Sequence, residues 1–147
     1  MATSKIGENF RSYLAASTDI NAIVGGSSSV NNARIFNNEE PNQTAANWIW
    51  FIRSREEQEQ LLDGTYSQII ETEFDIEAVV KGKQATADDL ADKIKARLKT
   101  ASVGTTMGND ATRACTFEDH DEDYIPRTGR NEGYSIAAIR AVVYHTT

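Results

Sequence analysis

Four carboxylates at alternate positions form the strongest chemical signal in the sequence. Glu71, Glu73, Asp75 and Glu77 recur at every second residue within the segment 66–80. A β-strand turns alternate side chains to the same face, so these acids are expected to form one carboxylate stripe. The intervening residues are mostly apolar and suit a core: Ile70, Thr72, Phe74, Ile76, Ala78 and Val80.

Paired carboxylates can act as general acid and base, or can hold Mg²⁺. A restriction-type nuclease core would also need a lysine shortly after the strand acid, in the pattern Glu/Asp-x-Lys. Ala78 and Val79 follow Glu77, so that lysine is missing. A solvated strand face is the simpler interpretation. A small cytosolic enzyme using Glu71, Glu73 or Asp75 and a monomeric binding module remain alternatives.

A second acidic run begins with the spacing of a calcium loop. Asp119, Asp121 and Asp123 match its first positions, but Tyr124 replaces the required glycine and Arg130 replaces the final glutamate. An EF-hand is therefore not predicted, and an exposed acidic loop is expected.

Cys115 is the single cysteine, so no intrachain disulfide is possible, which suits a reducing compartment. His120 and His145 are the two histidines, and a Cys-His-Asp nucleophile set can be drawn from them. Cys115 lies in an apolar strand pattern, which favours a small, buried and poorly reactive residue. The sequence contains no GxSxG, GxGxxG or P-loop motif, and no catalytic residue, metal site or cofactor is predicted.

Trp48, Trp50 and Phe51 fall in the most apolar run, residues 48–52. Aromatic side chains can stack on single-stranded nucleic acid, but the basic groove that such proteins need is missing from the pattern. Burial in the core or in a subunit interface is expected instead, because large apolar groups point to both faces of this strand.

Composition limits the remaining classes. The chain has 147 residues, a net charge of −7 and a pI near 4.8. One domain spanning residues 1–147 is expected, and bulk attraction to nucleic acid or to an anionic membrane is disfavoured. No apolar run is long enough for a membrane span, and the charged N-terminal segment is unlike a secretory signal.

The elements predicted from periodicity and caps are two helices and five strands. Residues 53–60 look too charged to extend the buried strand, residues 62–64 mark a turn, and residues 101–110 mark a loop. A short helical turn at 21–24 is capped by Thr18 or Asp19 and ends at Gly25. The helices are expected at 6–14 and 86–98, the second capped by Thr86, and the strands at 34–36, 48–52, 66–80, 112–118 and 134–145. Neighbouring strands are expected to pair antiparallel, which gives an α+β two-layer domain with a mainly antiparallel sheet flanked by two helices.

The order of these pieces resembles the tail-terminator or tail-completion family of tailed bacteriophages. That family begins with a helix that ends in a short Ile/Val-Gly turn, and then has an Arg-Ile-aromatic strand, a proline loop, an apolar strand, a turn, a long strand, a helix and two closing strands. The corresponding pieces here are residues 19–25, Arg34-Ile35-Phe36, Pro41, 48–52, 62–64, 74–78, 85–98 and the last two strands.

The resemblance implies structural work in a virion. It implies a hexameric ring that caps the tail tube, stops its polymerisation and offers a docking surface to the head-tail connector. The implied partners are further copies of the chain, the tail tube protein and the connector or stopper protein, with no cofactor and no membrane. The implied location is the tail end nearest the head, with the host cytoplasm during assembly. Another neck or connector ring protein of similar fold is the alternative.

A hexameric ring would give the carboxylate stripe a role. If Glu71, Glu73, Asp75 and Glu77 line the lumen, the acids of all subunits repel the phosphate backbone, and genomic DNA passes without specific binding. The alternative is that the stripe faces solvent on the outer wall.

Overall fold

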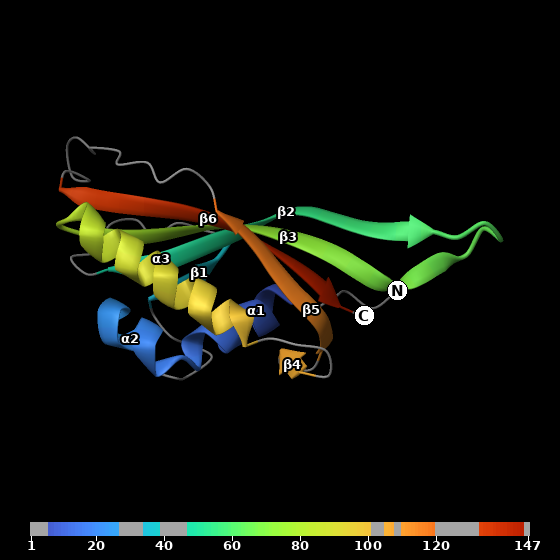
Figure 1. Ribbon diagram of the computed structural model, residues 1–147, viewed down its shortest axis with the longest axis horizontal. Helices are drawn as coiled ribbons and strands as arrows, with labels where there is room; N and C mark the ends of the chain where they lie inside the picture. Colours follow the sequence, from blue (N-terminus) through green and yellow to red (C-terminus); the bar gives the residue numbers. More distant parts are fainter. Residues whose placement is uncertain are drawn as a thin grey trace.

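The computed structural model describes residues 6–26, 34–38, 47–100, 105–107, 110–119 and 133–145. Within these ranges it contains three helices and a six-stranded sheet, an α+β fold as predicted (Figure 1). The elements are α1 (Ile6–Ala15), α2 (Thr18–Val24), β1 (Ile35–Asn37), β2 (Trp48–Gln60), β3 (Tyr66–Lys81), α3 (Gln84–Lys99), β4 (Thr105–Met107), β5 (Asp110–Asp119) and β6 (Tyr134–His145).

The sheet has the strand order β1-β2-β3-β6-β5-β4, so the last strand lies between β3 and β5. Four of the pairings are antiparallel, but β1 runs parallel to β2, with Ile35 in register with Ile49. The expectation that neighbouring strands pair antiparallel is therefore wrong at this edge. Apolar patterns report which faces of a strand are buried and not the direction in which neighbouring strands run, so they could not distinguish the two pairings.

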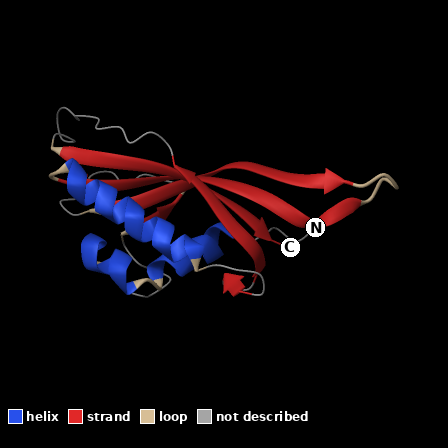
Figure 2. Cartoon of the chain, viewed as in Figure 1, coloured by secondary structure: helices blue, strands red, loops and turns tan. Residues whose placement is uncertain are grey.

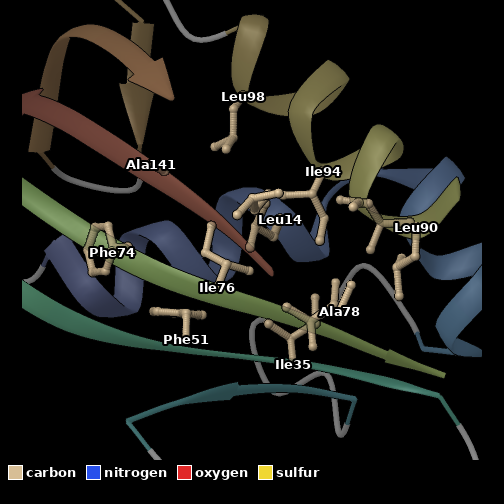
Figure 3. Packing of buried hydrophobic residues seen from close by; sticks show 14 of the residues in the cluster. Leu14, Ile35, Phe51, Phe74, Ile76, Ala78, Leu90, Ile94, Leu98 and Ala141 are labelled. Carbon is tan, nitrogen blue, oxygen red and sulfur yellow. The ribbon is translucent and has the colours of Figure 1, made fainter. Parts of the chain in front are cut away.

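The helices cover one face of the sheet (Figure 2). Phe74, Ile76 and Ala78 of β3 belong to the same buried core as Leu90 and Ile94 of α3, on the helix side of the sheet (Figure 3). The predicted apolar face of α3 is thereby confirmed. This packing is possible because apolar and acidic residues alternate along β3, and a strand turns every second side chain to the same face, here the face covered by the helices.

Three phenylalanines form the centre of this helix-side core. The rings of Phe10 on α1 and Phe74 on β3 are stacked with centroids 4.3 Å apart, and Phe51 meets both rings edge-on at 5.0 and 5.5 Å. All three rings are fully buried. Such aromatic pairs contribute about 0.5–1.5 kcal/mol beyond their buried area.

The helix starts differ from the predicted caps. Residues 18–24 form a helix, α2, whose cap is Ser17 rather than Thr18 or Asp19, because Ser17 Oγ accepts from the backbone N–H of Ile20 at 3.3 Å. Gly25 ends this helix with φ 74°, as predicted. Helix α3 starts at Gln84, and Lys83 caps it without a side-chain bond, so Thr86 lies inside the first turn.

Strand β2 is longer than its apolar pattern indicates, with 13 residues. A register shift at Ser54 interrupts its pairing with β3, and the strand then continues to Gln60 as a solvent-exposed ribbon. Residues 54–60 are exposed, as their charge predicts, but they continue the strand and do not end it. A strand whose faces are exposed to solvent can carry charged side chains. The predicted turn at 62–64 joins β2 to β3, and their hairpin projects beyond the helices (Figure 1).

A short strand, β4, replaces part of the loop predicted at 101–110 and pairs with β5. No helix in the described ranges is long and apolar enough to span a membrane.

Candidate functional site

The carboxylate stripe lies on the face of the sheet away from the helices. Glu71, Glu73, Asp75 and Glu77 are each half-buried, while the residues between them on β3 are buried against the helix layer or at its margin. The period-two prediction for this strand is therefore confirmed. β2 and β6 flank β3, so the side chains of these two strands decide what the stripe can do.

Two arginines on the neighbouring strands bind the stripe. Arg140 on β6 places Nε 3.0 Å from Asp75 Oδ1 and 3.1 Å from Glu73 Oε1. Arg55 on β2 lies 3.1 Å from Glu71 and 3.6 Å from Glu73. Charges placed opposite each other across strands stabilise their pairing. The stripe and its two arginines, called the charge ladder below, are therefore a bonded network and not a row of free carboxylates.

Arg55 also binds a fifth acid, Glu57, at 2.8 Å. The hydrogen bond from Arg55 to Glu57, together with the charge of that carboxylate, raises the pKa of Arg55 above its ordinary value. Carboxylates outnumber guanidinium groups on this part of the face, so its local charge stays negative.

Glu77 is held by an aromatic neighbour. Trp50 Nε1 donates to Glu77 Oε1 at 2.7 Å, and the two residues are in register across β2 and β3. Among the residues that the structure describes, no group of three His, Cys, Asp or Glu side chains is placed to hold a metal ion.

The aromatic residues of β2 separate to the two faces of the sheet. Phe51 lies in the helix-side core, whereas Trp48 is buried on the opposite face with Val79, Tyr134 and Ile136. The rings of Trp48 and Tyr134 meet edge-on at 5.0 Å. Trp48 and Phe51 are thus core residues of the single chain, and half-buried Trp50 is left as the member of this set that a second subunit could cover.

A buried hydroxyl–imidazole pair escaped the sequence analysis. Thr72 Oγ1 lies 2.7 Å from His145 Nε2 and donates to Glu56 Oε1 at 3.0 Å. Because the hydroxyl proton goes to Glu56, the imidazole N–H is the donor to Thr72. A general base would have to accept the hydroxyl proton of Thr72, whereas here the imidazole donates its own proton to that hydroxyl. Both side chains are also fully buried. The pair therefore fastens β6 to the base of the hairpin.

The remaining sequence candidates are only partly covered by the structure. Cys115 lies on β5 in register with Val143 of β6, and Asp119 is the last residue of β5. His120, Asp121 and Asp123 lie outside the described residues. His145 is engaged with Thr72, so the described residues show no Cys-His-Asp set built on His145.

The helix-free face also holds a hollow with a volume of about 800 Å³. Glu57, Glu59 and Glu71 line it together with Ile69 and Tyr144. It is an acidic hollow on the hairpin, next to the charge ladder.

Comparison with known proteins gives one informative result. No family model matches the chain, and no curated protein matches it. Among solved structures, the fold is similar to a chain from the "Virion of native gene transfer agent (GTA) particle", with a TM-score of 0.58 and 14% sequence identity. The match covers 93% of this chain and 89% of that chain. The chain therefore has, over nearly its whole length, the fold of a component of that virion.

Proposed function

We propose that the chain is a structural protein of a tailed-phage-like virion. The observation that carries the proposal is the fold shared with a gene transfer agent virion component over 93% of the chain. The order of sequence elements, which resembles the tail-terminator family, supports it independently. The carboxylates that could suggest an enzyme are tied to Arg55, Arg140 and Trp50, which is an arrangement suited to a rigid surface.

Within such a particle, we propose the tail-terminator role. Six copies form a ring on the end of the tail tube, stop its growth and present a docking surface to the connector. Removing the protein should then give tubes of uncontrolled length without heads. Tubes of normal length that fail to join heads would instead indicate the alternative, a connector or stopper ring.

We further propose that the face carrying Glu71, Glu73, Asp75 and Glu77 turns toward the lumen. The excess of carboxylates repels DNA phosphates. Arg55 and Arg140 are each shared between carboxylates, which compete with phosphate for the guanidinium groups. Passing DNA would meet a surface that does not hold it.

A charge reversal tests this orientation. The double variant Glu71→Lys and Asp75→Lys should slow DNA ejection from assembled particles, most strongly at low salt, where attraction is least screened. The matched control is Glu8→Lys with Asp89→Lys, which makes the same charge change at two exposed helix positions. Equal ejection rates for both variants at low salt would place the stripe on the outer wall.

A further inference from the structure

The tip of the β2–β3 hairpin carries large apolar side chains that the chain itself does not cover. Leu62 is fully exposed, and Leu61, Tyr66 and Ile69 are 47%, 60% and 42% exposed. The hairpin extends away from the helix layer, so these side chains project from the body of the molecule (Figure 1). Exposed apolar groups gathered on one projecting element indicate a contact with another protein.

The turn that bears these leucines is tightly bonded. Leu61 N–H donates to Thr65 O at 2.6 Å, and Asp63 Oδ1 accepts from both the backbone N–H and the hydroxyl of Thr65 at 3.0 and 2.6 Å. Gly64 supplies the positive φ of 88° that the turn requires. A bonded tip loses little conformational freedom on docking, which favours its use as a binding element.

A pocket lies on the helix layer. It has a volume of about 350 Å³ and forms where the corner between α1 and α2 meets the second half of α3. Its lining includes Ala16, Ser17 and Asp19 from the corner and Lys93, Ala96 and Arg97 from α3. The alanines and the aliphatic parts of the two cations offer an apolar surface to a leucine side chain, beside the polar groups of Ser17, Thr18, Asp19 and Thr100.

The pocket wall is held in place. Arg97 Nε donates to Tyr13 O at 2.9 Å, and its guanidinium lies 3.9 Å from the centroid of the Tyr13 ring. The hydroxyl of Tyr13, on α1, is hydrogen-bonded to Oγ1 of Thr100, the residue that caps the C-terminal end of α3. Residues 93–99 of α3 contain four cationic side chains and no acid.

The charges of the two elements are complementary. The hairpin brings Glu57, Glu59 and Asp63 close to the tip, whereas Lys93 and Arg97 line the pocket beside Asp19, and Lys99 lies on the same half of α3. The hairpin extends away from the helix layer of its own chain, so its tip cannot reach the pocket of the same chain (Figure 1). Complementary charge guides such contacts and fixes their orientation.

We propose that the Leu61–Leu62 tip of one copy docks into the α1–α2–α3 pocket of the next copy. The contact joins two different surfaces, and such head-to-tail contacts generate rings when the rotation closes. The inference rests on the ring of the proposed function and names the contact that closes it.

Sedimentation velocity over a range of protein concentrations tests the contact. The chain should self-associate, and Leu62→Ser should raise the concentration needed for association at least tenfold. Ile52→Ser is the control, because Ile52 is an exposed apolar residue of β2 outside the tip. Leu62 is fully exposed, so its replacement should leave thermal unfolding unchanged.

Charge exchange adds a test of the partner surface. Glu57→Lys with Glu59→Lys should weaken association, as should Lys93→Glu with Lys99→Glu. Mixing the two double variants should restore mixed oligomers, because each then offers the charge that the other lacks. A chain that remains monomeric at every concentration, or a mixture that associates no better than either variant alone, would overturn the docking proposal.

Cross-linking separates this inference from the proposed function. Leu62→Cys chains mixed with Ala96→Cys chains should give intermolecular disulfides that neither variant nor the wild type forms alone. Rings of six subunits that form without this cross-link, and that tolerate Leu62→Ser, would refute the docking contact while leaving the ring role standing.

Discussion

Arg140 on β6 reaches across to Glu73 on β3, with Nε 3.1 Å from Oε1, and the same nitrogen lies 3.0 Å from Asp75. The carboxylate stripe is therefore partly neutralised by an arginine of the neighbouring strand. Acids at alternate strand positions would repel one another if left alone, but here an arginine from the neighbouring strand is placed between two of them. The face is consequently a rigid, partly neutralised surface.

Replacing Arg140 should expose the repulsion that it offsets. Arg140→Ala should lower the free energy of unfolding by about 1 kcal/mol, the scale of a partly exposed ion pair. Arg140→Lys should lose less, because it keeps the charge. Added salt should stabilise the alanine variant relative to wild type by screening the repulsion among the acids of the stripe. Urea unfolding at low and high salt measures both effects, and an unchanged difference between the two salts would contradict the ladder.

Removing the buried hydroxyl of Thr72 should be costly despite the small change. Thr72→Val preserves shape but leaves the buried His145 N–H without its acceptor, which should destabilise the fold by about 1–3 kcal/mol. Thr72→Ser is the control, since it keeps the hydroxyl. Denaturant unfolding compares the two. A valine variant as stable as wild type would mean that the hydrogen bond does not fasten β6 to the hairpin base.

The Phe10–Phe51–Phe74 group should carry much of the stability of the helix-side core. Phe10→Ala removes a fully buried ring and should cost about 3–5 kcal/mol. Tyr66→Ala is the matched aromatic truncation at an exposed site and should change the stability of dilute protein by less than about 1 kcal/mol. Thermal and urea unfolding provide the comparison, and similar losses for both variants would contradict the packing described.

Asp63 in the hairpin turn should titrate at unusually low pH. Hydrogen bonds from the side chain and backbone of Thr65 hold the pKa of this carboxyl below its ordinary value. The ionised form is therefore favoured in the folded turn, and its contribution is present above pH of about 4 and is lost as the pH falls through the lowered pKa. In an NMR titration, Thr65→Ala should move the midpoint upward, and Thr65→Ser should not. A midpoint insensitive to Thr65→Ala would contradict this origin.

Local patterns predicted most of the elements. Period-two alternation located β3, and the apolar spacing of residues 87–98 located α3, because each pattern depends on one element meeting one core. The second half of β2 was not predicted, because beyond Ser54 the strand does not contact the core. Its residues therefore show no apolar pattern from which a strand could be recognised. The cap of α2 was not identified because Ser17, Thr18 and Asp19 all carry side chains that can cap a helix, and the cap of α3 left no signal because Lys83 makes no side-chain bond.

The charge ladder could not be derived from local patterns. Arg140 and Asp75 are 65 residues apart, and they meet only because β6 inserts beside β3. Arg140 was nevertheless a visible signal, since it is the one ionised side chain expected in the otherwise apolar last strand. The Thr72–His145 pair has the same origin in long-range strand register.

The location of the protein in intact particles tests the central claim most directly. Electron microscopy of particles carrying a labelled copy should show the label as a single ring at the joint between head and tail. Label spread along the tail, label at the far end, or particles that contain none of the protein would contradict the account.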